Sequence, residues 1–204
     1  MGRLLRSTAV LAGLTDTAEI SRTTIRHLWP GLYTGRVKPN GWAADEVVNQ
    51  VMITRGLQPD APGHIHFSAR ALDGERVGAD DASLTTALSR GPYAKPALVP
   101  ASPWLDADPP PTPELDVSVR GDAVLMSWRR AGGERPFLWV VYAERKLRGW
   151  EHHILPAGRT GFRLPLTLTE EQSGTEENGQ LLSVAVSAVD RLGNLSAPQP
   201  RAIP

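Results

Sequence analysis

The hydrophobic positions of this 204-residue chain follow two different patterns, and a proline-rich segment separates them. Before the segment, short apolar runs alternate with stretches of helical periodicity. After it, apolar and polar residues alternate at period two between turns. Proline fixes φ and removes a backbone donor, so the segment cannot form a helix or a central strand. We therefore predict one domain over residues 1–105, a Pro-rich linker over residues 106–113 and a second domain over residues 114–204.

The first half alternates candidate strands with candidate helices. Apolar runs at residues 26–34 and 63–69 are typical of buried strands. Residues 40–56 and 81–91 have helical apolar spacing, and each stretch ends at a glycine, the usual stop after a helix. Strand–helix–strand–helix is the repeat of a parallel α/β structure.

Two strands are too few for a stable parallel core, because a parallel sheet needs both faces covered and a closed barrel of this kind needs eight strands. The first half is therefore predicted to be the last two strand–helix units of an incomplete (β/α)8 barrel. Three explanations stay open: a coding sequence assigned too short, a fragment, or pairing with another chain. The expected partner of the first half is therefore a missing N-terminal barrel segment or a partner chain.

The second half gives a candidate strand about every ten residues, which is the spacing of a β-sandwich. The predicted strands are residues 115–119, 123–128, 137–143, 150–155, 161–166 and 181–189, with a last edge strand after Asn194. Residues 190–194, with their Gly and Asn, predict a tight turn. Trp128 and the closing residues 184–198 resemble fibronectin type III domains. The fold class is thus α/β plus all-β.

The composition limits the possible partners of the chain but does not indicate a function. The chain is 41% hydrophobic and 22% charged, with a formal net charge of +0 and no cysteine. Such a chain has no overall field that would draw it to nucleic acid or to an acidic membrane, so neither is an expected partner. Residues 1–14 start as a weak signal peptide does, but Arg6 interrupts the apolar run and the spacing favours a helix face. No stretch is long enough to span a bilayer.

Three segments carry a family resemblance: His-Leu-Trp-Pro-Gly-Leu at residues 27–32, Gly-His-Ile-His-Phe-Ser-Ala-Arg-Ala-Leu at 63–72, and Gly-Pro-Tyr-Ala-Lys-Pro-Ala-Leu-Val-Pro-Ala-Ser-Pro-Trp-Leu-Asp at 91–106. Together they resemble the C-terminal part of bacterial family 10 glycosyl-hydrolase-like proteins, in which a (β/α)8 barrel precedes a fibronectin-type-III-like module. The resemblance implies that the two strands are barrel strands seven and eight. It also implies a polysaccharide substrate, with bacterial cell-wall glycan favoured, and an extracytoplasmic location in the periplasm or cell envelope.

Four residues are candidates for substrate binding. Tyr33 lies at the mouth of the first strand, where an aromatic ring could stack on a sugar. His64, His66 and Ser68 alternate with apolar residues and so share one face of the second strand. We expect the apolar face to pack against the helix at residues 40–56 and the polar face to point into the barrel. The alternative, that the histidines are buried polar residues with satisfied hydrogen bonds, stays open.

A catalytic pair is not visible, and the catalytic residues stay unknown. Glycoside hydrolysis needs two carboxyl groups flanking the scissile bond, and barrels supply them from the carboxyl ends of strands. Neither strand ends in Asp or Glu. Asp45 and Glu46 open a helix, where they favour the helix dipole. Asp73 and Glu75 lie in a loop that has the character of a solvated acidic connection. We therefore expect the chain alone to be inactive.

No cofactor is expected, and no metal site, because His64 and His66 have no third ligand at a recognisable spacing. Adjacent His152 and His153 point to opposite faces of a strand and cannot chelate one metal. At least one of Trp139 and Trp150 is predicted to lie in the core. Two hypotheses follow: the C-terminal part of a glycoside hydrolase with an accessory module, or a non-enzymatic β-sandwich that binds carbohydrate or protein.

Overall fold

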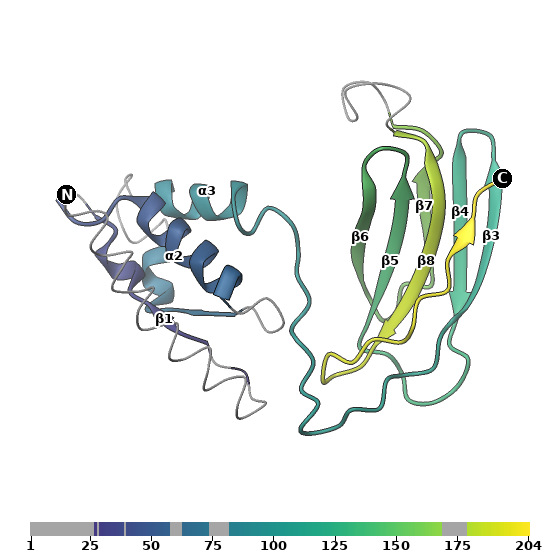
Figure 1. Cartoon of the computed structure of the whole chain (residues 1–204), viewed down its shortest axis with the longest axis horizontal. Helices are drawn as coiled ribbons and strands as arrows, with labels where there is room; N and C mark the ends of the chain where they lie inside the picture. Colours follow the sequence, from purple (N-terminus) through teal and green to yellow (C-terminus); the bar gives the residue numbers. More distant parts are fainter. Residues whose placement is uncertain (1–26, 28, 39, 58–62, 74–81, 169–178) are drawn as a thin grey trace. The chain divides into compact units, whose positions relative to one another are not determined.

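The computed structural model describes residues 27, 29–38, 40–57, 63–73, 82–168 and 179–204. The chain forms two compact units, Met1–Pro96 and Ala97–Pro204 (Figure 1). The predicted helix or signal peptide at residues 1–14 lies outside the described residues.

The first unit contains the predicted strand–helix–strand–helix order. Its elements are β1 (Gly31–Leu32), a 3-10 turn (Thr34–Arg36), α2 (Ala44–Leu57), β2 (Ile65–His66), a second 3-10 turn (Ala69–Leu72) and α3 (Ala82–Arg90). β1 and β2 pair in parallel, with Gly31 opposite Ile65 and Leu32 opposite His66. The parallel pairing is confirmed, and it forms a two-stranded sheet. The barrel itself stays a prediction.

The core of this unit lies between the helices and one face of the sheet. Leu32 packs there with Val47 and Val51 of α2 and with Leu84 and Leu88 of α3. Each of these side chains is at most 3% exposed. The four helical residues have the i, i+4 spacing that puts them on one face of each helix, so their side chains are buried together against β1. Both helices therefore cover the same face of the short sheet.

The second unit is a β-sandwich of two antiparallel sheets (Figure 1). Its strands are β3 (Glu114–Arg120), β4 (Ala123–Arg129), β5 (Leu138–Arg145), β6 (Gly149–Pro156), β7 (Gly161–Pro165), β8 (Leu181–Val189) and β9 (Arg201–Ala202). One sheet has the order β3-β4-β7 and the other β6-β5-β8-β9. The six predicted strands are confirmed, with ends that differ by at most two residues, and β9 is the predicted last edge after Asn194.

Inward-facing residues of the two sheets form one core. Trp128 of β4 and Trp139 of β5 meet edge to face, with their ring centroids 6.1 Å apart. Aromatic pairs of this geometry add to the stabilisation from buried area. Trp139 is 2% exposed and Trp150 is 50% exposed, so the prediction that at least one of these two lies in the core is confirmed.

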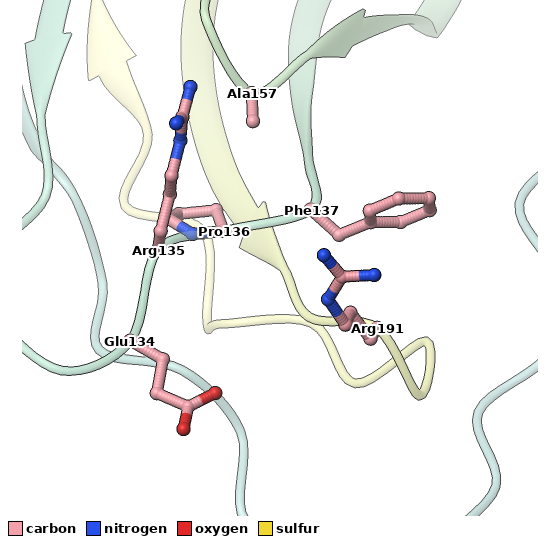
Figure 2. Close-up of a pocket in the computed structure, with 6 residues that line it drawn as sticks. All are labelled: Glu134, Arg135, Pro136, Phe137, Ala157 and Arg191. Atoms are coloured by element: carbon pink, nitrogen blue, oxygen red, sulfur yellow. The ribbon is translucent and has the colours of Figure 1, made fainter.

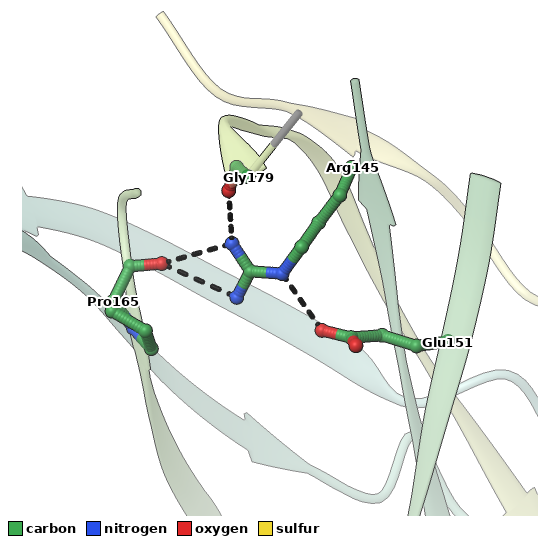
Figure 3. Close-up of polar contacts among 4 residues, drawn as sticks. All are labelled: Arg145, Glu151, Pro165 and Gly179. Carbon is green, nitrogen blue, oxygen red and sulfur yellow. Dashed lines mark hydrogen bonds and ion pairs between the residues drawn. The ribbon is translucent and has the colours of Figure 1, made fainter. Parts of the chain in front are cut away.

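A buried arginine links the sheets at one end of the sandwich (Figure 3). Arg145, at the end of β5, is 2% exposed. Its Nε donates to Glu151 of β6 at 2.8 Å, and its Nη1 donates to the carbonyl of Gly179 at 2.7 Å. Both Nη1 and Nη2 also reach the carbonyl of Pro165, in the other sheet, at 3.3 Å. The buried guanidinium charge is therefore paired with a carboxylate, and each of its three nitrogens donates a hydrogen bond.

The proline-rich segment at residues 97–113 contains no helix or strand, as predicted, and it is attached to the sandwich. The amide of Ser102 donates to the carbonyl of Leu192 at 2.9 Å, and Asn194 Nδ2 donates to the carbonyl of Asp106 at 3.1 Å. Thr112 Oγ1 donates to the carbonyl of Ala197 at 3.1 Å. The boundary between the compact units accordingly falls after Pro96, earlier than the linker proposed from sequence.

The predicted turn at residues 190–194 is confirmed, and one carboxylate organises it. Asp190 Oδ1 accepts hydrogen bonds from the amides of Leu192 at 2.8 Å and Asn194 at 2.9 Å. Asp190 Oδ2 accepts from Asn194 Nδ2 at 2.8 Å. Gly193 has a φ of +86°, which glycine adopts without strain. The turn is fixed by its own side chains.

Candidate functional site

The two faces of β2 are arranged opposite to the sequence prediction. Leu32, directly opposite His66, is buried under the helices, whereas Ile65 and Phe67 are 55% and 65% exposed. The apolar side chains of β2 therefore point away from α2. The expectation that this apolar face would pack against the helix at residues 40–56 is wrong, because the alternation with Ile65 and Phe67 places His64 and His66 on the helix side.

On the helix side, both histidines converge on one tyrosine. His64 Nε2 hydrogen-bonds Tyr93 Oη, and His66 Nε2 lies 2.5 Å from the same oxygen. The two imidazole rings meet edge to face, with centroids 5.1 Å apart. Tyr93 follows α3 and is held there by its amide, which donates to the carbonyl of Leu88 at 2.8 Å. A phenol has one proton, so one histidine accepts it and the other donates to the oxygen.

This cluster keeps its histidines neutral. Burial, then the neighbouring His66 and then Arg55 lower the pKa of His64 to about 4. Burial also lowers the pKa of His66. Burial raises the pKa of Tyr93, and Arg55, whose guanidinium carbon lies 5.7 Å from the tyrosine ring centroid, opposes that rise. At neutral pH neither ring is an imidazolium, and each neutral imidazole has a single N–H. Bonded to the phenol of Tyr93, the two rings hold the loop after α3 against β2.

The opposite face of the sheet is aromatic and open. Tyr33 directly follows β1 and is 49% exposed; its ring meets that of Phe67 edge to face at 5.7 Å. The guanidinium carbon of Arg36 lies 5.5 Å from the Tyr33 ring centroid. A Cβ on Gly63 would lie 2.2 Å from Trp29 Nε1, so the indole occupies the space that a side chain at residue 63 would need. Three aromatic side chains thus come from the segments that flank the two strands: Trp29 before β1, Tyr33 after it and Phe67 after β2.

Tyr33 and Ser68 lie at the carboxyl ends of the strands, as predicted. Thr34 Oγ1 donates to the Ser68 carbonyl at 3.4 Å, and the amide of Gly35 donates to the Phe67 carbonyl at 3.3 Å. These bonds join the segments that follow the two strands. Ligands of parallel α/β structures bind at this end of the sheet. Of the four predicted site residues, Tyr33 and Ser68 thus occupy the expected end, and His64 and His66 lie in the tyrosine cluster.

No carboxylate follows either strand in the described part of the first unit. Glu46 is 4% exposed in the first turn of α2, where Gln50 Nε2 donates to its Oε1 at 3.0 Å. This is the position in which a carboxylate complements the helix dipole, as predicted. Asp45 is in the same turn, and Asp73 follows the second 3-10 turn. Glu75 lies outside the described residues.

Sequence reasoning missed Tyr93 and Arg55. The alternation at residues 64–68 indicates that the polar side chains on one face need hydrogen-bond partners if they are buried. It does not indicate which distant segment supplies these partners. Among the described residues, no group of three His, Cys, Asp or Glu side chains is placed to hold a metal ion. No helix in the described ranges is both long enough and apolar enough to cross a membrane.

The histidines of the second unit do not form a site with each other. His152 is exposed, whereas His153 packs against Phe162 with ring centroids 4.9 Å apart. They lie on opposite faces of β6, as predicted. Burial is the main cause of the lowered pKa of His153, although Glu151 acts in the other direction.

No family model matches the chain. Over 93 residues the chain is 38% identical to a Bacillus subtilis (strain 168) protein named Glycosyl hydrolase YngK. That alignment covers 44% of this chain and 17% of the relative, so the chain spans a small part of the relative's length. The chain is thus similar to a glycosyl hydrolase over part of its length.

Solved structures with some likeness include an FN3 domain of human collagen XX and the Clostridium perfringens spore cortex lytic enzyme SleM. The first has 16% identity and a TM-score of 0.35, and the match covers 52% of this chain and 100% of that one. The second has 12% identity and a TM-score of 0.39, and the match covers 95% of this chain and 76% of that one.

Proposed function

We propose that the chain is the C-terminal portion of a glycoside-hydrolase-like protein that acts on polysaccharide outside the cytoplasm, with bacterial cell-wall glycan as the favoured substrate. In this proposal the first unit supplies the last two strand–helix units of a (β/α)8 barrel. The sandwich is an accessory module. The similarity to a named glycosyl hydrolase over 93 residues supports this assignment.

The open aromatic face of the first unit is the observation that carries the proposal. A parallel sheet with helices on one face needs a cover on the other, and the exposed side chains there include Ile65, Phe67 and Tyr33. Further barrel strands, from a preceding segment or from a partner chain, would place this face in the barrel interior. Tyr33 and Ser68 would then line the substrate mouth, and the catalytic carboxylates would come from the other strands.

His64 and His66 have a different role in this proposal. Because both are bonded to Tyr93 on the helix side, they position the loop that follows α3. The bonds of their Nε2 atoms support the alternative that the sequence left open, namely buried polar residues with satisfied hydrogen bonds, whereas Nδ1 of each ring is buried without a partner among the described residues. Glycan contact at these two histidines stays a prediction that only binding measurements would test.

The test begins with the genomic DNA upstream of the Met1 codon. An in-frame extension that encodes further strand–helix units, with an Asp or Glu at a strand end, is the expected result. A stop codon followed by a ribosome-binding site directly before Met1 would contradict the barrel fragment.

The extended protein should hydrolyse cell-wall glycan, and the 204-residue chain should not. In the extended protein, Tyr33→Ala should raise KM for glycan because it removes a ring at the mouth, while His66→Ala should lower the melting temperature with a smaller effect on KM. If His66→Ala raised KM and left the melting temperature unchanged, His66 would be a substrate contact and the assignment of roles would be wrong.

A further inference from the structure

Two adjoining hollows lie at one end of the β-sandwich, where β4 and β8 end and β5 begins. Their volumes are about 540 and 500 Å³. They share Arg135, Pro136 and Ala157, so they form one continuous depression, which we call the arginine hollow. Figure 2 shows part of it, with Arg135 and Phe137 from the segment that leads into β5 and Arg191 from the turn after β8.

The lining of the arginine hollow is strongly cationic. Four arginines line it, against one carboxylate, that of Glu134: Arg129, Arg130, Arg135 and Arg191. This local excess contrasts with the formal net charge of +0 for the whole chain. A local field of one sign on a neutral protein favours recognition of an oppositely charged ligand at that place, rather than general adhesion to polyanions.

Two of these arginines are already engaged, and two are available. Arg129 pairs with Glu114, and Arg130 Nη1 donates to the carbonyl of Gly133 at 3.0 Å. Within the part of the chain that the structure describes, Arg135 makes no hydrogen bond or ion pair, and Arg191 makes none from its guanidinium, which lies over the Phe137 ring at 5.5 Å. A guanidinium presents a planar fork of donors that matches a carboxylate in two parallel bonds.

An apolar surface lies beside the available guanidiniums. Phe137 is 50% exposed although its backbone is fixed, since its amide donates to the carbonyl of Val189 at 2.7 Å. Pro136 and Ala157 extend this surface. Deeper in the wall, Trp128 is 5% exposed, and its Nε1 is a buried donor with no partner among the described residues. Buried polar atoms without partners are uncommon, so this one marks an incomplete part of the wall.

We propose that the arginine hollow is a binding site for an acidic sugar chain. Carboxylates on the sugars would pair with Arg135 and Arg191, and the apolar face of a pyranose ring would lie beside Arg191 on the exposed part of the Phe137 side chain. The anionic character of the ligand follows from the charges of the hollow. The choice of a sugar among anions rests on the proposed function, in which the sandwich is the accessory module of a polysaccharide-degrading protein.

The test is isothermal titration of the full 204-residue chain with hexagalacturonate, a uronic acid oligomer, at low ionic strength. Fully methyl-esterified hexagalacturonate is the control ligand because it keeps the sugars and removes the charges. Hexametaphosphate is the second control ligand, since it carries charge without sugar. Binding of hexagalacturonate, with at least tenfold weaker binding of both controls, is expected. Equal binding of hexametaphosphate would overturn the proposal, because it would show a site for polyanions in general.

The variants are Arg135→Gln, Arg191→Gln and Phe137→Leu, with Arg120→Gln as the matched control at the opposite end of the sandwich, where β3 ends. Each hollow arginine should weaken hexagalacturonate binding about tenfold, because it removes a charge-assisted bond. Phe137→Leu should weaken it about threefold. Arg120→Gln should leave it unchanged. All melting temperatures are measured, and using two arginines keeps the test decisive if one variant fails to fold.

No binding of hexagalacturonate, or binding that survives both arginine substitutions, would show that the hollow is not an acidic-sugar site. The assay involves no hydrolysis. An extended protein without hydrolytic activity would therefore contradict the proposed function but not the acidic-sugar site, if hexagalacturonate binds. An active extended protein that does not bind hexagalacturonate in the arginine hollow would contradict the acidic-sugar site but not the proposed function.

Discussion

Replacing the buried Arg145 by methionine should destabilise the sandwich strongly while leaving its apolar packing largely in place. Methionine fills much of the space of the arginine stem but has no donors. The substitution removes the bonds to Glu151, Pro165 and Gly179 shown in Figure 3. Two backbone carbonyls then lose a partner, whereas the carboxylate of Glu151, whose side chain is 33% exposed, can turn to water.

The expected cost is about 3 kcal/mol, at the lower edge of what is lost when a buried charged pair is broken. Glu151→Gln should cost less, about 1 kcal/mol, because the amide oxygen still accepts from Nε and only the charge compensation is lost. Arg120→Met, an exposed arginine in the neighbouring sheet, should change stability by less than about 0.5 kcal/mol.

Urea unfolding of the full chain measures these values, with tryptophan fluorescence as the probe because Trp128 and Trp139 lie in the sandwich core. A cost of 3 kcal/mol corresponds to a fall of roughly 12–20 °C in melting temperature for a domain of this size. If Arg145→Met stayed within about 1 kcal/mol of the wild type, the buried guanidinium would not be a link between sheets. If Glu151→Gln cost as much, the ion pair and not the carbonyl contacts would carry the effect.

Three further predictions concern other parts of the chain. Because burial and His66 lower the pKa of His64 to about 4, the folded first unit binds fewer protons than the unfolded chain between pH 6.5 and 4. Its free energy of unfolding should therefore decrease as the pH is lowered from 6.5 to 4, by about 1 kcal/mol after allowance for the solvent-exposed part of the ring. In thermal melts, His64→Gln should make the melting temperature less dependent on pH; an unchanged dependence would argue against a buried neutral His64. Gly63→Ala should displace the Trp29 indole and cost about 1–2 kcal/mol in chemical denaturation, and combining it with Trp29→Ala should abolish the added cost. A piece covering residues 97–204 should unfold cooperatively and be about 2 kcal/mol more stable than residues 114–204, because only the longer piece keeps the bonds of Ser102, Asp106 and Thr112 to the sandwich; equal stability would mean that this segment is a passive linker.

The sandwich was predictable because its strands are marked locally. Alternation at period two, interrupted by turns such as the one at residues 190–194, placed six strands within one or two residues of their observed ends. The two-sheet arrangement followed from their number and spacing. What the sequence did not contain was the attachment of the proline-rich segment, since the bonds from Asp106 and Thr112 reach residues more than eighty positions away.

In the first unit, the elements and the parallel pairing were predictable but the orientation of β2 was not. The alternation of His64 and His66 with Ile65 and Phe67 says which side chains share a face; it does not say which face the helices cover. The usual rule puts apolar residues under helices, and here Tyr93, 27 and 29 positions further along the chain, supplies the bonds that allow the reverse. Partners at such separations leave no local pattern.

The turn after β8 separates the positions that make the fold from those that face the solvent. Asp190, Gly193 and Asn194 satisfy the backbone of the turn among themselves, and the side chain of Arg191 takes no part in that network. Residue 191 can therefore change while the loop keeps its shape. Natural or engineered substitutions at residue 191 would therefore replace the cation at this end of the sandwich by an anion or an aromatic ring. The backbone of the turn would not have to change.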